Sequence, residues 1–343
     1  MNRRLWTIVG TLFLVSILTA SFFVTAYAQT PKTVEWRAYI EESEGAPEWV
    51  YMKHCSDEIF KRSDGEVKIS IYPEASLGYE AAQLPDVVGK GLLEAALLRC
   101  SHASGVNQLL NLGDLTFLQN KAEEAEIVTK VLTPYYDKAL EKIGCHVMSM
   151  WKSAPTGLTC KKNVNTVDAW KGLALRAWNP TLQDLSVLLG VKPVQMPYSE
   201  AFQALSTGII DGIYWTASSA YDSKTYDAGC KYYDQWNIFN MTNAIIVSDK
   251  ALQKLSPKAR KAVEEVWKEL EPEVWKSEYW SFEQDYKDLR SKGVEVVMVD
   301  VKEIEKVRAK ASPVWDKWLD RAGAEGLKAL NDVLKALGRP AYR

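Results

Sequence analysis

The sequence predicts an α/β fold built as two similar lobes, and three observations support this prediction. Strand patterns alternate with helix patterns along most of the chain, which is typical of sheets covered by helices. The segments at 87–98 (VVGKGLLEAALL) and 204–215 (ALSTGIIDGIYW) also resemble each other. In both, a helical pattern ends at a glycine and an apolar strand follows an acidic residue. Finally, a helical pattern of about 35 residues near the C-terminus would be about 50 Å long, too long for one small lobe.

The first half of the chain predicts four strands separated by helices. The strand at 66–73 is the clearest, because Val67, Ile69 and Ile71 alternate with polar residues, a pattern of half-buried strands. The β-α-β-α-β-α-β order predicts a mostly parallel sheet with helices on its faces. The expected strands are 34–40, 66–73, 94–98 and 145–151, and the expected helices are 47–61, 80–89 and 122–143.

The second half repeats this order over a shorter length. Pro180 favours a helix start and Gly190 a helix end, while Ser199 and Gly208 bound the next helix in the same way. The expected strands are 173–177, 193–196 and 209–215. The two similar segments therefore occupy the same helix-to-strand step in each lobe. That step leads to the C-terminal edge of a sheet, where open α/β folds bind ligands.

The C-terminal part predicts the long helix and a short α/β tail. Ser256 and Pro257 form a favourable helix start, the pattern runs to about Arg290, and Pro272 is expected to kink or break it. Two final helices hold Trp315, Trp318 and Leu330 after a strand at 294–299. We expect lobe I to comprise 29–153 and 242–283, lobe II to comprise 154–241 and 284–343, and the ligand cleft to lie between them.

The N-terminus predicts export. A basic head precedes a mostly apolar run from Leu5 to Thr25, and Ala26, Tyr27 and Ala28 follow as a small-x-small cleavage signal. We expect a signal peptide at 1–28 with cleavage after Ala28, although the apolar run also nears the length of a membrane anchor. The formal net charge of −2 gives no reason to expect nucleic acid as a partner.

The sequence gives no positive support for catalysis or metal binding. The three histidines are far apart in sequence, and nucleophile-elbow, phosphate-loop and dinucleotide-binding motifs are absent. Asp222 and Asp227 are interpreted as solvated surface charges. The five cysteines form no C-x-x-C pair, and we expect buried structural thiols, with a Cys145–Cys160 disulfide as the alternative. No cofactor and no metal are expected.

Arg176 is the strongest candidate for a ligand contact. It lies near the C-terminal end of an apolar strand within LALRAWN (173–179), shortly before a helix that begins with proline. A guanidinium group matches a carboxylate through two parallel hydrogen bonds. At the C-terminal end of a strand it would point into a cleft. The other interpretation is a structural ion pair with an acidic residue of the other lobe, and position alone does not separate the two.

Several motifs resemble the DctP-type solute-binding proteins of TRAP transporters. They include RSDGEVKISIYPEASLG, LGDLTFL, DAWKGLALRAWNP and LLGVKPVQMPYSEAFQALSTGIIDG, in the order typical of that family, and the resemblance covers about Val34 to Leu270. Its most specific part is Gly172 to Gly212. The resemblance implies a periplasmic-binding-protein architecture: two α/β lobes, a cleft that closes on an organic acid, and a long helix spanning both lobes.

The resemblance also implies roles for single residues. It marks Arg176 as the carboxylate-binding arginine, Tyr198 as the pocket aromatic residue of the M-P-[FY]-S-E motif, and Trp215 as a ligand contact. Thr156 stands where many relatives have a second arginine, which argues against a dicarboxylate or sialic acid held by two arginines. Tyr214 stands where some keto-acid binders have a glutamate that coordinates a cation. Arg99 either supplies the missing positive charge or forms a surface salt bridge.

The function expected from these observations is capture of an organic acid in the periplasm and its delivery to TRAP membrane subunits. A monocarboxylate with an apolar or aromatic body is favoured, because aromatic residues cluster near Arg176 in the sequence. A secreted α/β enzyme and a ligand-binding sensor are the alternatives, and a monomer is expected. The candidate ligand-binding residues are Arg176, Trp215, Tyr198, Trp178, Asn179, Thr156, Arg99 and Tyr214.

Overall fold

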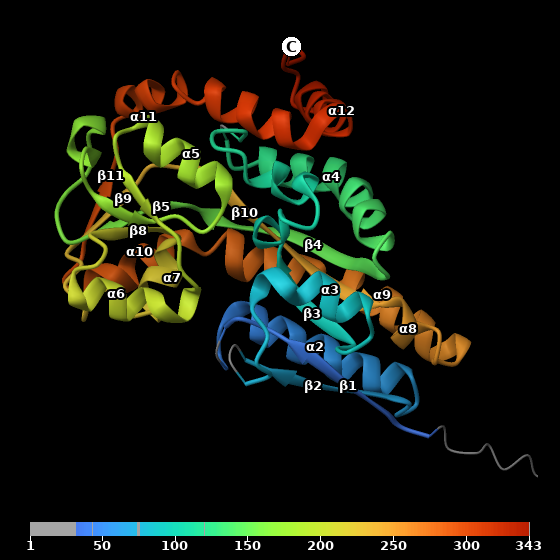
Figure 1. The fold of residues 1–343 in the computed structure, drawn as a ribbon. Coiled ribbons are helices and arrows are strands. Elements are labelled where there is room, and N and C mark those ends of the chain that lie inside the picture. Colours follow the sequence, from blue (N-terminus) through green and yellow to red (C-terminus); the bar gives the residue numbers. More distant parts are fainter. Residues whose placement is uncertain (1–31, 43, 74–75, 120, 343) are drawn as a thin grey trace, which may run out of the picture. The chain divides into compact units, whose positions relative to one another are not determined.

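The computed structural model describes residues 32–42, 44–73, 76–119 and 121–342. Residues Thr33–Arg343 form one compact unit, which contains two sheets covered by helices (Figure 1). The α/β fold class is confirmed. The predicted signal peptide at 1–28 and its cleavage site lie outside the described residues. No helix within the described ranges is both long and apolar enough to cross a membrane.

The sheet of lobe I has five strands in the order β2-β1-β3-β10-β4. Strands β1, β2 and β3 pair in parallel, and β10 pairs antiparallel with both β3 and β4. Strands β1 to β4 therefore run in one direction, and β10 is inserted among them in the opposite direction. The strands are β1 (Val34–Tyr39), β2 (Val67–Tyr72), β3 (Ala95–Arg99), β4 (Cys145–Pro155) and β10 (Asn240–Ser248). The helices of this lobe are α2 (Pro47–Arg62), α3 (Leu84–Gly89), α4 (Glu124–Glu141) and α8 (Asp249–Leu252).

The sheet of lobe II has six strands in the order β11-β9-β5-β8-β6-β7. Only β5 runs against its neighbours, since it pairs antiparallel with β8 and β9 while the other pairs are parallel. The strands are β5 (Gly157–Cys160), β6 (Ala174–Arg176), β7 (Lys192–Val194), β8 (Gly212–Trp215), β9 (Tyr232–Gln235) and β11 (Glu295–Met298). The helices are α5 (Pro180–Leu188), α6 (Ala201–Thr207), α7 (Ala217–Asp222), α10 (Phe282–Ser291) and α11 (Val301–Arg308).

The two sheets share one topology. Read from β2 and from β7, both place three parallel strands first, then one antiparallel strand, then another strand in the original direction. The predicted mostly parallel sheets are confirmed, with one antiparallel strand in each; strands β5, β9 and β10 were not predicted. The antiparallel strand in each sheet follows directly after the chain crosses from the other lobe. Sequence order cannot reveal such an insertion, because the neighbours of the strand are distant in the chain.

The two similar segments lie at equivalent places in these sheets. Gly91 follows α3 with φ of 72°, and Gly208 follows α6 with φ of 77°. Each left-handed glycine turns the chain from the helix into the third strand of its sheet, β3 in lobe I and β8 in lobe II. The predicted correspondence of these two segments is confirmed.

The lobes are joined by two extended crossings and by the long helix. Thr156 lies in the first crossing and donates its backbone N–H to the carbonyl oxygen of Phe239 in the second, at 2.9 Å. The backbone N–H of Ile238 returns a bond to the carbonyl oxygen of Thr156 at 3.0 Å. The two crossings therefore form one hydrogen-bonded unit between the sheets.

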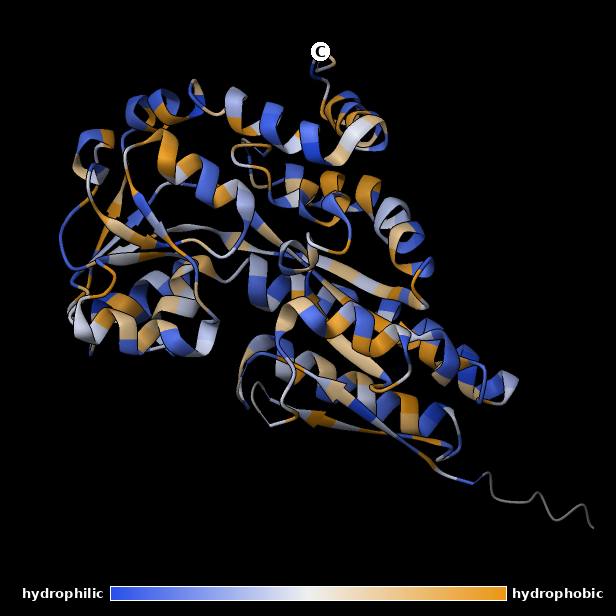
Figure 2. Cartoon of the chain, in the orientation of Figure 1, coloured by the Kyte–Doolittle hydropathy of each residue, from blue (hydrophilic) through white to orange (hydrophobic). Residues whose placement is uncertain are grey.

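The long helix is confirmed as a spanning element, in three parts: α9 (Pro257–Val274), the π-helical turn η7 (Trp275–Tyr279) and α10. Pro272 lies inside α9 without ending it, and the irregular turn follows three residues later. Val263 and Trp267 pack in the core of lobe I, whereas Leu289 of α10 packs against α7 in lobe II. Figure 2 shows hydrophobic and hydrophilic residues mixed along α9, as expected of a helix with one buried face.

The C-terminal helix α12 (Ser312–Ala336) differs from the predicted lobe boundary. Val314 packs in the core of lobe II, but Trp318 and Leu330 pack with Leu132 of α4 in the core of lobe I. The helix changes direction at Gly323. By packing, most of α12 belongs to lobe I, whereas the sequence assigned 284–343 entirely to lobe II.

The five cysteines are buried and free, so the predicted structural thiols are found and the alternative disulfide is not. Cys145 begins β4 of lobe I, whereas Cys160 ends β5 of lobe II. They lie in different sheets because the chain crosses between the lobes after β4.

Candidate ligand-binding site

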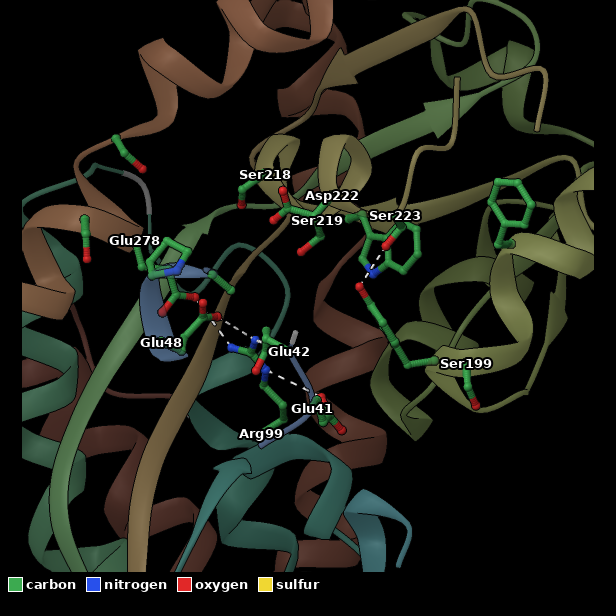
Figure 3. A pocket seen from close by; sticks show the side chains of 17 residues that line it. Glu41, Glu42, Glu48, Arg99, Ser199, Ser218, Ser219, Asp222, Ser223 and Glu278 are labelled. Carbon is green, nitrogen blue, oxygen red and sulfur yellow. Dashed lines mark hydrogen bonds and ion pairs between the residues drawn. The ribbon is translucent and has the colours of Figure 1, made fainter. Parts of the chain in front are cut away.

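A cavity of about 320 Å³ lies between the lobes at the C-terminal ends of their strands. From lobe I, Glu41 and Glu42 follow β1, and Arg99 ends β3. From lobe II, Trp215 ends β8. The two equivalent strands β3 and β8 thus deliver Arg99 and Trp215 to the same space. Further lining side chains include Glu48 of α2, Glu278 of η7, Tyr198, and Ser218, Ser219 and Asp222 of α7 (Figure 3).

A second, smaller cavity of about 30 Å³ lies beside Arg176, enough for one water-sized group. It is lined by Thr156, Trp178 and His102, among others. The two cavities share six lining residues, so a ligand could occupy both. These are Glu41, Glu42, Arg99, Tyr198, Trp215 and Ser219.

Arg176 is the last residue of β6 and is 2% exposed. Its Nε donates to the carbonyl oxygen of Met196 at 3.2 Å. Its guanidinium carbon lies 5.1 Å from the ring centre of Trp178, 6.0 Å from Tyr198 and 5.9 Å from Trp215. Three aromatic rings therefore lie within cation–π distance of the guanidinium group.

Arg99 is surrounded by four carboxyl groups. Its Nη2 donates to Glu48 at 2.7 Å and to Glu42, and Nη1 lies 3.5 Å from Glu278. Its Nε lies 3.6 Å from Glu41. The side chain is 8% exposed, so Arg99 is buried, and the predicted surface salt bridge is wrong. Its positive charge is already outnumbered by its partners.

Burial changes the ionisation of these acids in different directions. Burial raises the pKa of Glu41, but nearby His102, Arg99 and Arg176 outweigh it and leave the pKa below its usual value. Burial and the neighbouring Glu48 hold the pKa of Glu42 well above its usual range, although Arg99 opposes them. Burial, with Glu48, raises the pKa of Glu278 to about 7. The cavity therefore binds protons near neutral pH to offset its own negative charge.

Three polar atoms in the wall of the small cavity have no hydrogen-bond partner among the described residues. They are Oε2 of Glu42, Nε2 of His102 and Nε1 of Trp178. Trp178 is 8% exposed, and its indole N–H can only donate. Buried polar groups are nearly always hydrogen-bonded in native proteins. Unpaired donors and acceptors around one cavity indicate a site built for a polar ligand.

The sequence model of the DctP family, described as bacterial extracellular solute-binding protein family 7, matches residues 39–321. The chain belongs to this family of TRAP-transporter solute-binding proteins. The sialic acid-binding periplasmic protein SiaP of Vibrio cholerae is 24% identical over 71% of this chain and 74% of its own length.

Two solved structures share the DctP fold at low sequence identity. One is a Bordetella pertussis extracytoplasmic solute receptor binding pyroglutamic acid, with a TM-score of 0.83, 22% identity, and coverage of 88% of this chain and 100% of that one. The other is a TRAP periplasmic solute-binding protein from Desulfovibrio salexigens with bound orotic acid, with a TM-score of 0.83 and 20% identity. The structural match covers 89% of this chain and 98% of the Desulfovibrio salexigens chain. These DctP relatives are solute receptors.

Six of the eight predicted contact residues line the cavities of this DctP protein: Arg176, Trp215, Tyr198, Trp178, Thr156 and Arg99. Asn179 does not line them, because its Oδ1 caps α5 by accepting from the backbone N–H of Leu182 at 2.9 Å. Tyr214 is fully buried; its hydroxyl lies 3.0 Å from Ser186 Oγ, and its ring packs against Trp170. Neighbouring strand residues point to opposite faces, which separates Tyr214 from Trp215.

None of the acidic residues that line the larger cavity was among the predicted ligand contacts. Asp222, interpreted there as a solvated surface charge, lines the larger cavity, although it remains exposed at the rim. Glu41 and Glu42 follow β1 after Ile40, and two adjacent acids at the C-terminal end of a predicted strand could have indicated the site. Glu278 gave no such signal, because it reaches the cavity from the irregular turn of a helix that begins far along the sequence.

Proposed function

We propose that this protein captures a monocarboxylic organic acid in the periplasm, after signal-peptide cleavage at Ala28, and delivers it to the membrane subunits of a TRAP transporter. The single observation that carries the proposal is Arg176, a buried guanidinium group at the C-terminal end of β6 that lines a cavity between the lobes. Family membership supports the transport role. A monomer suffices for this role.

The surroundings of Arg176 support a carboxylate with an apolar or aromatic body. Trp178, Tyr198 and Trp215 surround the guanidinium group and offer flat apolar faces next to it. Thr156, in place of a second arginine, contributes no charge. A second carboxylate on the ligand would instead meet Glu41, whose pKa lies below its usual value, and like charges in a buried site repel strongly. This arrangement favours monocarboxylates over dicarboxylates.

Substitution of Arg176 tests the proposal. A thermal-shift panel of pyroglutamate, orotate, glucuronate, pyruvate, benzoate, succinate and malate first identifies the acid that stabilises the protein most. A ligand at 100 times its dissociation constant adds about 2.7 kcal/mol. Calorimetric titration of that acid into Arg176→Ala should then give an affinity about 30- to 4,000-fold lower, since truncating one partner of a buried charge pair costs about 2–5 kcal/mol.

Arg176→Lys should also bind poorly, because an ammonium group keeps the charge but loses the two-pronged geometry. Arg260→Ala serves as the control, since Arg260 is half-exposed on α9 and pairs only with Glu264 on its own helix among the contacts described. Affinity of folded Arg176→Ala within about threefold of the parent would rule out the carboxylate contact. Stronger stabilisation by succinate or malate than by any monocarboxylate would rule out the preference.

A further inference from the structure

The two cavities carry an excess of acidic side chains. Five carboxyl groups (Glu41, Glu42, Glu48, Asp222 and Glu278) and two guanidinium groups (Arg99 and Arg176) line them, an excess of three formal negative charges. Among the described residues, no lysine lines either cavity. A receptor for a simple anion gains nothing from such a lining, because each carboxylate repels the ligand.

Arg99 does not neutralise this excess. Its guanidinium group contacts four of the five acids, and Asn243 also accepts a hydrogen bond from it at 2.7 Å. Trp151 donates to Glu278, as does Ser153, without adding charge. Oε2 of Glu42 is buried with no partner in the described part of the chain. An unpaired, buried carboxyl oxygen calls for a hydrogen-bond partner, which the ligand can supply.

The positions of the charges separate the site into two ends. Arg176 and the unpaired indole N–H of Trp178 lie at the small cavity and both donate hydrogen bonds. Glu48, Glu278 and Asp222 line only the larger cavity. Figure 3 shows Glu42 and Glu48 beside Arg99, with Ser218, Ser219 and Asp222 of α7 across from them. One end therefore suits an anionic group and the other a cationic donor.

We infer that the ligand is a zwitterion, a carboxylic acid that also carries a positively charged nitrogen, with the nitrogen held by Glu42, Glu48 and Asp222. This inference rests on the proposed function, because it takes the carboxylate to be bound at Arg176. In the described residues no three His, Cys, Asp or Glu side chains are arranged to hold a metal ion, and an organic cation is the partner that remains. Desolvation at the cavity and the neighbouring Glu48 raise the pKa of Glu278 to about 7 and that of Asp222 to about 6, so a cationic nitrogen bound here would take the place of protons.

Matched ligand pairs test the inference by calorimetric titration. The probes are straight-chain ω-amino acids of three to six carbons with the alkanoates of equal length, proline with cyclopentanecarboxylate, and phenylalanine with 3-phenylpropanoate. Alkylamines of equal length form the third arm. In at least one pair the amino acid should bind about tenfold tighter or more than its partner without nitrogen, which is about 1.4 kcal/mol.

The outcomes separate this inference from the proposed function. If every acid without nitrogen binds as tightly as its amino counterpart, the inference fails and carboxylate capture stands. If alkylamines bind as tightly as the amino acids, the carboxylate is dispensable and the proposed function fails. If no amino acid, nitrogen-free acid or alkylamine binds measurably, the result counts against both the zwitterion inference and the proposed function.

Neutralising variants provide a test that a structural role cannot imitate. Asp222→Asn should lower the affinity for the tightest-binding amino acid about 3-fold, since Asp222 is exposed at the rim. Glu48→Gln should lower it about 30-fold, since Glu48 is buried. The same variants should bind the matching acid without nitrogen more tightly, because its carboxylate is no longer repelled by the substituted side chain. Glu325→Gln, an exposed acid on α12, should change neither.

The inference would be overturned if a variant lost affinity equally for the amino acid and for the matching acid without nitrogen. This comparison uses only variants whose melting curves show a folded protein. If Glu48→Gln does not fold, Asp222→Asn decides alone, because its side chain lies at the solvent-exposed rim.

Discussion

At the scale of single residues, burial decides which groups carry charge. Lys152 has no exposed surface, donates to Gly113 and Thr242 at 2.7 and 2.6 Å, and has its pKa lowered by burial to about 8. Asp234 is also fully buried; its Oδ2 accepts from the backbone N–H of Val164 at 3.1 Å, and burial raises its pKa to about 7. Both groups are held in environments that disfavour their charged forms.

Asp234 therefore makes stability depend on pH in a defined direction. Its folded pKa of about 7 exceeds the unfolded value of about 3.9, so the native state holds a proton that the unfolded chain has lost. This contribution is complete below about pH 4 and is lost as pH rises toward about 7. Asp234→Asn removes it. We therefore compare the free energy of unfolding of the variant with that of the parent at pH 4.5 and at pH 8. The difference, variant minus parent, should be about 1–3 kcal/mol more positive at pH 8 than at pH 4.5.

Urea titrations of both proteins at the two pH values measure this difference. The parallel substitution Asp300→Asn, at the exposed cap of α11, controls for general effects of losing one carboxylate. A difference between variant and parent that does not change with pH would contradict the ionisation argument.

At the scale of elements, the two similar segments perform the same turn. Each helix is followed by a left-handed glycine, and each following strand ends at a residue of the ligand cavity, Arg99 or Trp215. The turn therefore fixes where the strand begins and, through the strand register, which side chain reaches the cavity. A one-residue slip would exchange Trp215 for Tyr214, because successive side chains alternate between the faces of a sheet.

Gly208→Ala tests the turn. Nothing lies within 4 Å of the added Cβ, so the change acts only through the backbone, where φ of 77° strains a residue with a side chain. We expect a loss of about 1–2 kcal/mol in the free energy of unfolding. Gly208→Asn should lose less, because asparagine tolerates the left-handed region.

Gly105→Ala is the matched control. Its added Cβ is equally free of contacts, and its φ lies outside the left-handed range. It should change stability by no more than about 0.5 kcal/mol. If Gly105→Ala and Gly208→Ala are equally destabilising, the conformation of Gly208 is not the cause.

At the scale of the whole molecule, the lobes are joined by few connections around one cavity. The two crossings are hydrogen-bonded to each other through Thr156, and the long helix is interrupted at η7 where it passes between lobes. The C-terminal helix α12 adds a link, since Lys317 and Arg321 both pair with Asp184 of α5. Elements with local breaks of this kind absorb the dihedral changes of hinge bending.

Ligand binding should therefore close the lobes. Small-angle X-ray scattering with and without the tightest acid from the panel should give a smaller radius of gyration for the bound form. Folded Arg176→Ala at the same acid concentration should keep the ligand-free value. An unchanged radius in the parent, with saturation verified by calorimetry, would mean that the cleft is already closed before binding.

The sequence by itself determined the two α/β lobes, the long spanning helix and the placement of Arg176, Tyr198 and Trp215 at the cavity. These features are local: strand periodicity, helix ends at Gly91 and Gly208, and short motifs are written in neighbouring residues. Only the tertiary structure decided that β10 and β5 run antiparallel to their neighbours, that α12 packs mainly on lobe I, and that Arg99 is buried among carboxyl groups. Those features depend on contacts between segments more than 50 residues apart, such as the one between Arg99 and Glu278. The energy of such contacts comes from burial and charge proximity, which no local pattern in the chain records.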